Sequence, residues 1–198
     1  MTAIKSLTAG LLAGLILFLT PGFLPAQSPQ ILLVVPPRDF HYREVDTPRK
    51  VFTQAGFKVI LASRRLGDLP GLKGGKVRPD RLLTQVAAQD FDAVLFVGGP
   101  GAARYLNDPQ AQALARQGLQ HGKVVAASSQ AVMILARAQL LKGKKATCPP
   151  AHKKELAAAG AKFVEAPVVQ DGKLLTASGP GAARDLAHAI VELLKAKP

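Results

Sequence analysis

Cysteine, tryptophan and acidic residues are scarce in this 198-residue chain, which has one cysteine and no tryptophan. The single cysteine, Cys148, cannot form a disulfide within the chain, so the core must stabilise the fold. Aromatic residues make up only 5% of the sequence, and no nucleic-acid-binding motif is present. Since proteins that read nucleic acids usually carry such a motif or stacking aromatics, we expect no specific nucleic-acid partner.

The shortage of acids leaves a strong positive charge. The 26 Lys and Arg residues outnumber the 13 Asp and Glu residues, which gives a formal net charge of +13. Because the basic residues are scattered along the sequence, we expect an ordinary solvated surface. A second interpretation is that basic residues clustered on one face bind acidic envelope polymers or lipid headgroups.

The first residues have the pattern of a secretory signal. Lys5 gives a positive start, residues 7–19 form an apolar run, and Ala26 ends a small-residue cleavage site. The run is shorter than the roughly 20 residues that a membrane-spanning helix needs, although an uncleaved N-terminal anchor is the alternative. We therefore predict a signal peptide at residues 1–26, one domain at 27–198, a secreted or periplasmic location, and no transmembrane span after signal removal.

Apolar β-rich runs and helical patterns alternate through this domain. Strands are predicted at residues 31–35, 58–62, 93–97 and 123–128, with further strands at 146–148, 162–169 and 174–177, the last two joined by an Asp-Gly turn. Helices are predicted at residues 48–55, 81–88, 109–120, 129–141, 151–159 and 182–195. In the first helix, Thr47 is the expected N-cap and Pro48 the first helical residue. The alternation predicts an α/β fold, a three-layer sandwich with a mostly parallel sheet.

In open α/β sheets, sites lie beyond the carboxyl ends of the strands. We therefore expect a site at the turns after Val35, Val97 and Ser128. The strand that ends at Ser128 passes directly into a helix, so Ser129 lies at the tip of a candidate nucleophile elbow. Such a turn lifts a side chain above the sheet and leaves backbone N–H groups free to hold an oxyanion. Alanines replace the glycines of the G-x-S-x-G pattern, and the alternative is that Ser129 simply caps the helix.

Five stretches in the second half of the chain resemble, in order, the C-terminal half of the ThiJ/PfpI family. They are residues 123–127, 141–148, 155–161, 168–176 and 178–181. With the Gly98-Gly99 turn and the Asp39-Phe40 loop, the resemblance covers nearly the whole chain from Ile31 onward. It implies a flavodoxin-like sandwich related to class I glutamine amidotransferases, and a homo-oligomer, since members are often dimeric or hexameric.

Active members of this family typically carry an elbow cysteine followed by His-Gly, with a glutamate from the first loop hydrogen-bonded to the cysteine. By the resemblance, Ser129 stands at the cysteine position and Gln130 at the histidine position. His41 stands at the glutamate position, and Glu44 lies three residues beyond it. The resemblance therefore implies that the usual catalytic pair is absent.

The binding pocket of the family is better matched than its catalytic pair. Gly98 and Gly99 match the turn whose backbone helps to form the oxyanion pocket, and we expect Gln130 and Glu44 to line the same space. Cys148 matches a common non-nucleophilic cysteine of the family and is not the missing thiol.

Two functions follow from this pattern. The favoured one is a non-catalytic or divergent relative that binds a small-molecule ligand in the Ser129 pocket. The alternative is an enzyme, either a serine-based hydrolase or a glyoxalase- or deglycase-like protein, in which His41 acts as the base for Ser129 and Glu44 or Asp39 orients the imidazole. In the first case His41 is a solvated loop histidine.

No metal or other cofactor is predicted. The other histidines lie at a predicted helix end (His121), at the start of a helix (His152) and within the last helix (His188). None of the four histidines has metal-ligand spacing with acidic residues or with Cys148.

Overall fold

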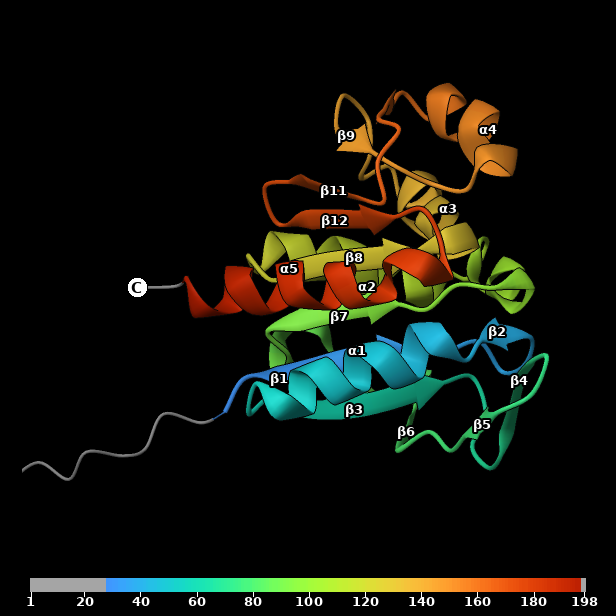
Figure 1. Cartoon of the computed structure of the whole chain (residues 1–198), viewed down its shortest axis with the longest axis vertical. Helices are drawn as coiled ribbons and strands as arrows, with labels where there is room; N and C mark the ends of the chain where they lie inside the picture. The colour runs from blue at the N-terminus through green and yellow to red at the C-terminus, as the bar shows by residue number, and fades with distance from the viewer. Residues whose placement is uncertain (1–27, 197–198) are drawn as a thin grey trace, which may run out of the picture.

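A seven-stranded sheet forms the centre of the computed structural model, which describes residues 28–196 (Figure 1). The strand order is β11-β12-β8-β7-β1-β3-β6, and every neighbouring pair is parallel except β11 and β12. The strands are Gln30–Val34 (β1), Lys58–Ser63 (β3), Arg81–Leu82 (β6), Ala93–Phe96 (β7), Val124–Ser128 (β8), Val168–Asp171 (β11) and Leu174–Ala177 (β12). The predicted signal peptide, residues 1–26, lies outside the described residues.

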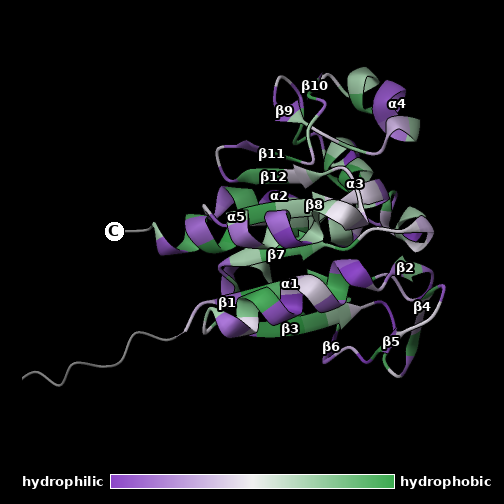
Figure 2. Cartoon of the chain, viewed as in Figure 1, coloured by the Kyte–Doolittle hydropathy of each residue, from purple (hydrophilic) through white to green (hydrophobic). Residues whose placement is uncertain are grey.

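Helices cover both faces of this sheet. They are Arg43–Gln54 (α1), Pro109–Gln120 (α2), Val132–Arg137 (α3) and Ala183–Lys195 (α5). A further helix, Lys153–Ala158 (α4), contacts α3. Successive residues of β1 point to opposite faces, so Leu33 packs in the apolar cluster under α1 and α5, whereas Leu32 packs in the cluster with α2 and α3. In Figure 2, α1 and α5 each carry both green and purple residues, as expected of helices with one apolar face. The predicted three-layer α/β sandwich is confirmed.

Shorter elements complete the described chain. A small sheet joins Phe40–His41 (β2), Leu69–Leu72 (β4) and Lys76–Val77 (β5), and Lys145–Ala146 (β9) pairs with Lys162–Phe163 (β10). The 3-10 turns are Leu83–Gln85 (η1), Ala88–Asp90 (η2), Pro100–Tyr105 (η3), Ser129–Ala131 (η4), Pro150–His152 (η5) and Pro180–Ala182 (η6). No helix within residues 28–196 is long and apolar enough to cross a membrane.

The predicted start of the first helix is wrong, and the difference matters for the site. Helix α1 begins at Arg43, and Pro48 lies inside it rather than at its first position. Proline inside a helix loses one backbone hydrogen bond, but Val45 and Pro48 are both buried, so packing outweighs the loss. The earlier start places Glu44 in the first helical turn, on the buried side.

Two other predicted helices differ from the structure. Residues 81–88 form a short strand, one 3-10 turn and the start of a second, because residues 81 and 82 pair with the end of β3 and the Gln85 side chain accepts a hydrogen bond from the backbone N–H of Leu82 (3.0 Å). The helix after β8 ends at Arg137, and Gln139 adopts a left-handed conformation with φ of 61°. The Asp171-Gly172 hairpin is confirmed, since β11 and β12 pair antiparallel around it.

The Tyr105 hydroxyl connects the segments that follow three strands, at the edge of the sheet where a site is expected. Its buried hydroxyl donates to the carbonyl oxygen of Val35 (3.0 Å), just after β1, and accepts from the N–H of Arg64 (3.2 Å), just after β3. Burial raises the pKa of this hydroxyl. Because Tyr105 ends η3, the segment that follows the Gly98-Gly99 turn is held against the loops after β1 and β3.

Candidate functional site

Ser129 lies at a sharp turn between the last residue of β8 and η4. Its backbone is left-handed, with φ of 51°, and its side chain is buried, with 3% of the residue exposed. A non-glycine residue in this conformation costs about 1–3 kcal/mol and persists only where its surroundings impose it. The predicted elbow at Ser129 is therefore present as a strained turn.

Glu44 is the side chain that holds this turn. One of its carboxylate oxygens, Oε1, accepts a short hydrogen bond from the Ser129 hydroxyl. The other, Oε2, accepts from the Ser128 hydroxyl and from the backbone N–H of Gly98 (2.8 Å). Glu44 is 1% exposed, so its carboxylate, both elbow hydroxyls and the Gly98 amide form one buried network.

The contact between Glu44 and Ser129 corrects the sequence analysis. By the resemblance, His41 is expected at the position of the family's glutamate, and Glu44 is expected only to line the pocket or to orient His41. The structure instead brings Glu44 to the elbow residue, because α1 begins early enough to turn this side chain inward.

His41 enters the site from β2, but among the described residues its side chain lacks the hydrogen bonds expected of a base for Ser129. Its backbone N–H donates to the carbonyl oxygen of Gly98 (3.1 Å), and its half-buried side chain faces the same cavity as Ser129. Among residues 28–196, no hydrogen bond joins the His41 side chain to Ser129, Glu44 or Asp39. The Asp39 carboxylate pairs with Arg38 (3.3 Å). The structure therefore brings Ser129 and His41 to one cavity without the hydrogen bond that a dyad would have.

The cavity above Ser129 has a volume of about 260 Å³. It is lined by Ser129, Gln130, Gly99, Ser178 and two histidines, His41 and His152. Gly99 has φ of 112°, and an added Cβ would lie 2.7 Å from the backbone nitrogen of His41, so glycine is required there. The N–H of Gln130, at the start of η4, has no partner within its own helix. Residues that carry hydroxyl, amide and imidazole groups therefore surround a space suited to a small polar molecule.

His152 is the lining residue that sequence analysis missed. It ends η5, and its Nδ1 lies 3.7 Å from Oε2 of Glu155. In the sequence it appeared only as the start of a helix, far from the elbow. Its position in the cavity depends on how the segment after β9 folds back over the sheet, which no local spacing indicates.

Cys148 lies outside this cavity and is 1% exposed. Burial raises the pKa of its thiol to about 11, with a smaller contribution from the Glu155 carboxylate. The thiol is therefore protonated at neutral pH and is a poor nucleophile.

We expect iodoacetamide at pH 8 to alkylate Cys148 more than about tenfold more slowly in the folded chain than in the urea-unfolded chain, because an unfolded thiol has a pKa near 8.5. Intact-mass spectrometry over time measures both rates. The folded-state rate is expected to rise with pH as the thiolate forms near the raised pKa of about 11. Equal rates in the two states at pH 8 would show that Cys148 is reactive in the fold.

Comparisons with known proteins agree with this architecture. The model of the DJ-1/PfpI family matches residues 29–193. A protein of Methanocaldococcus jannaschii is 37% identical over 78% of this chain and 77% of its own length, and a deglycase of Pyrococcus horikoshii is 30% identical over 83% and 99%. A glutathione-independent glyoxalase of Caenorhabditis elegans is 27% identical over 83% of this chain and 88% of its own length.

Solved structures give the same result. The crystal structure of a ThiJ/PfpI domain protein from Brachyspira murdochii superposes with a TM-score of 0.84 and 33% identity, covering 86% of this chain and 99% of that one. Drosophila melanogaster DJ-1beta superposes with a TM-score of 0.77 and 30% identity, over 86% and 92%. The family match spans nearly all of the described residues, and the neighbours share the mostly parallel sheet. The chain therefore belongs to the DJ-1/PfpI family and has its flavodoxin-like α/β fold.

Proposed function

We propose that this chain is a divergent DJ-1/PfpI protein whose Ser129 pocket binds a small carbonyl or carboxylate compound without the cysteine chemistry of active members. The observation that carries this proposal is the side chain at the elbow. Ser129 occupies the strained turn and bonds to Glu44, whereas the chain's one cysteine, Cys148, is buried elsewhere. In this proposal Ser129 stands where active members carry their thiol.

The consequence for reactivity follows from the difference between the two groups. A thiol can be held as a thiolate by its surroundings, and the thiolate attacks carbonyl carbons directly. A serine hydroxyl attacks only when a base removes its proton during the reaction. The Glu44 carboxylate that accepts from Ser129 also accepts from Ser128 and Gly98, and no imidazole among residues 28–196 is hydrogen-bonded to Ser129, so we expect little turnover.

The pocket nevertheless keeps groups that can bind a carbonyl or carboxylate oxygen. In this proposal the oxygen is held by the backbone N–H groups of Gly99 and Gln130, two residues that line the cavity together with Ser129. His41 and His152 add imidazole nitrogens to the wall. The cavity of about 260 Å³ has room for a compound of a few carbon atoms. Relatives named as a deglycase and a glyoxalase support small carbonyl compounds as the ligand class.

The four histidines of the chain allow a direct test of this proposal. Pyruvate, a small carbonyl and carboxylate compound, is titrated into ¹⁵N-labelled protein while the imidazole signals are followed by NMR. We expect the signals of His41 and His152 to shift, whereas those of the exposed His121 and His188 serve as internal controls. Equal shifts of all four histidines, or none, would count against a ligand site at Ser129.

A second candidate is a serine-dependent hydrolase, which one contact favours. The Ser129 hydroxyl already donates to a carboxylate, so Glu44 rather than His41 is the group placed to receive its proton. In that mechanism the Ser129 oxygen attacks an acyl carbon as its proton passes to Glu44, and a histidine of the cavity wall protonates the leaving group. Water then hydrolyses the acyl-serine ester and restores Ser129. Hydrolysis of p-nitrophenyl acetate by the wild type that is lost in Ser129→Ala would support this candidate over the first.

Two further proposals concern the chain as a whole. We propose export to a secreted or periplasmic location, on the basis of the signal pattern at residues 1–26, and assembly as a homo-oligomer. Expression of the full chain followed by N-terminal sequencing tests the first, with Gln27 as the expected first residue of the mature protein. Light scattering of the purified protein tests the second.

A further inference from the structure

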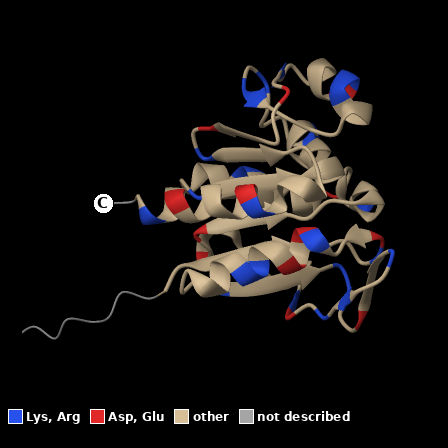
Figure 3. Cartoon of the chain, viewed as in Figure 1, with Lys and Arg blue, Asp and Glu red and all other residues tan. Residues whose placement is uncertain are grey.

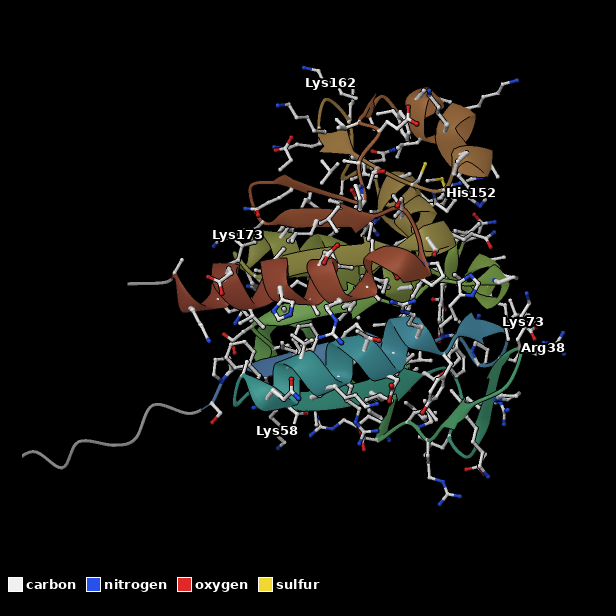
Figure 4. The ribbon with its side chains drawn as sticks, viewed as in Figure 1. Arg38, Lys58, Lys73, His152, Lys162 and Lys173 are labelled. Carbon is white, nitrogen blue, oxygen red and sulfur yellow. The ribbon has the colours of Figure 1, made fainter. Side chains whose placement is uncertain are left out.

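Three arginines converge on a second cavity at the carboxyl edge of the sheet. Arg38 follows β1, Arg65 follows β3, and Arg104 lies in η3 after β7. Together with Pro37 and Pro70 they line a cavity of about 620 Å³. Figure 4 shows Arg38 at the end of the molecule toward which the strands point, and Figure 3 shows further blue segments on the loops around β4 and β5.

The positive charge of this cavity is only partly balanced. Asp39 pairs with Arg38 (3.3 Å), but the nearby Asp68 pairs with Lys76 (2.8 Å) and Arg78 (3.1 Å) instead. Within residues 28–196, neither Arg65 nor Arg104 forms an ion pair with a carboxylate. One carboxylate therefore accompanies three guanidinium groups, and their mutual repulsion favours binding of an added anion.

One of the three guanidinium groups is held in place by the backbone. Nη2 of Arg65 donates to the carbonyl oxygens of Asp68 (3.1 Å) and Pro37 (3.5 Å), which leaves the charge of the group uncompensated. Pro37 itself lines the cavity, so Arg65 is anchored across its wall. A guanidinium that is fixed before binding loses less entropy when it binds an oxyanion.

We infer that the cavity between Arg38, Arg65 and Arg104 is a second ligand site, which binds the phosphate group of a small organic molecule. A phosphate presents several oxygens in different directions, and planar guanidinium groups donate to such oxygens in pairs. The volume exceeds what a single inorganic phosphate fills, and Pro37 and Pro70 supply apolar surface for the organic part. This inference does not rest on the function proposed for Ser129.

One segment of the chain contributes residues to both cavities. Gly99 and Pro100 line the Ser129 cavity, while Arg104 of the same segment lines the arginine cavity. The N–H of Gly101 donates to the carbonyl oxygen of Asp39 (3.1 Å), so η3 is fixed against the loop that carries Arg38. An added Cβ at Gly101 would lie 1.8 Å from the carbonyl oxygen of Arg38, which shows how closely the two segments approach.

Calorimetric titration of the purified chain with glycerol 3-phosphate and with inorganic phosphate, at constant ionic strength, tests this site. We expect both probes to bind, and Arg104→Gln and Arg38→Gln each to weaken binding about tenfold or more. Both side chains are exposed, so neither variant is expected to disturb folding. The matched control is Arg184→Gln, which removes the same charge from an exposed position on α5 and should change affinity less than about twofold.

Three results would overturn the inference. The first is no binding of either probe to the wild type, and the second is equal weakening by Arg104→Gln and Arg184→Gln, which would indicate a general effect of net charge. The third is binding to phosphatidylglycerol vesicles with no binding of the two soluble probes, which would identify a membrane surface instead.

Discussion

Gly98→Ala is expected to lower the free energy of unfolding by about 3 kcal/mol, because there is no space for a methyl group beside the elbow. An added Cβ would lie 2.3 Å from the carbonyl oxygen of Ser128, 2.5 Å from Cβ of Ser129 and 2.7 Å from Oε2 of Glu44. Relief of these contacts requires movement of the backbone turn or of the buried carboxylate. Urea unfolding followed by circular dichroism measures the loss.

Gly181→Ala is the matched control for this substitution. Gly181 is exposed, and an added Cβ would meet nothing within 4 Å. We expect its free energy of unfolding to change by less than about 0.5 kcal/mol. Similar losses for the two variants would show that the close approach at Gly98 does not decide the effect.

Glu44→Leu is expected to destabilise the fold by about 3–5 kcal/mol, since it leaves three buried donors without their acceptor. These donors are the hydroxyls of Ser128 and Ser129 and the backbone N–H of Gly98. The hydroxyls can rotate in search of other partners, but the Gly98 amide is fixed by the backbone. The same unfolding experiment measures the effect, with Glu192→Leu on the exposed side of α5 as the control.

A combined variant separates lost hydrogen bonds from altered packing. Ser128→Ala and Ser129→Ala, introduced together into Glu44→Leu, remove two of the three donors that have lost their acceptor. Because removal of both partners of a buried hydrogen bond costs less than removal of one, we expect the triple variant to be more stable than Glu44→Leu alone. If the loss of stability in the triple variant equalled the sum of the losses in Glu44→Leu, Ser128→Ala and Ser129→Ala, these three side chains would not form one network.

The sequence predicts the arrangement of the sheet and the place of the site well. Continuous apolar runs such as 31–35 and 93–97 are typical of strands buried on both faces, and their order along the chain leads to a parallel sheet. The carboxyl ends of such strands lie at one edge of the sheet, so the Gly98-Gly99 turn and Ser129 are expected to lie close together. In the structure an added Cβ at Gly98 would lie 2.5 Å from Cβ of Ser129.

The partner of Ser129 was harder to predict because it depends on the start of one helix. Thr47 and Pro48 form a good local start signal, but burial of Val45 and Glu44 extends α1 toward the N-terminus. With that shift, the residue that faces the elbow is Glu44 rather than His41. A carboxylate followed by apolar residues at helical spacing was the available signal, and it was weaker than the proline.

His152 and the arginine cavity could not be predicted for a different reason. Their members come from segments far apart in the sequence, such as Arg38, Arg65 and Arg104, and no local pattern joins them. Only the parallel order of β1, β3 and β7 brings the three loops together. Scattered charge in a sequence can therefore become clustered charge in the fold.

The most direct test of the proposed function compares methylglyoxal consumption by the wild type, Ser129→Ala and Ser129→Cys. If the elbow, Glu44 and the backbone amides are retained and the missing thiol is what prevents turnover, the wild type and Ser129→Ala should be equally inactive, and Ser129→Cys should gain activity. A wild-type rate that falls on Ser129→Ala would contradict the claim that the pocket binds without turnover. A Ser129→Cys variant no faster than the wild type would contradict the claim that the rest of the site is retained.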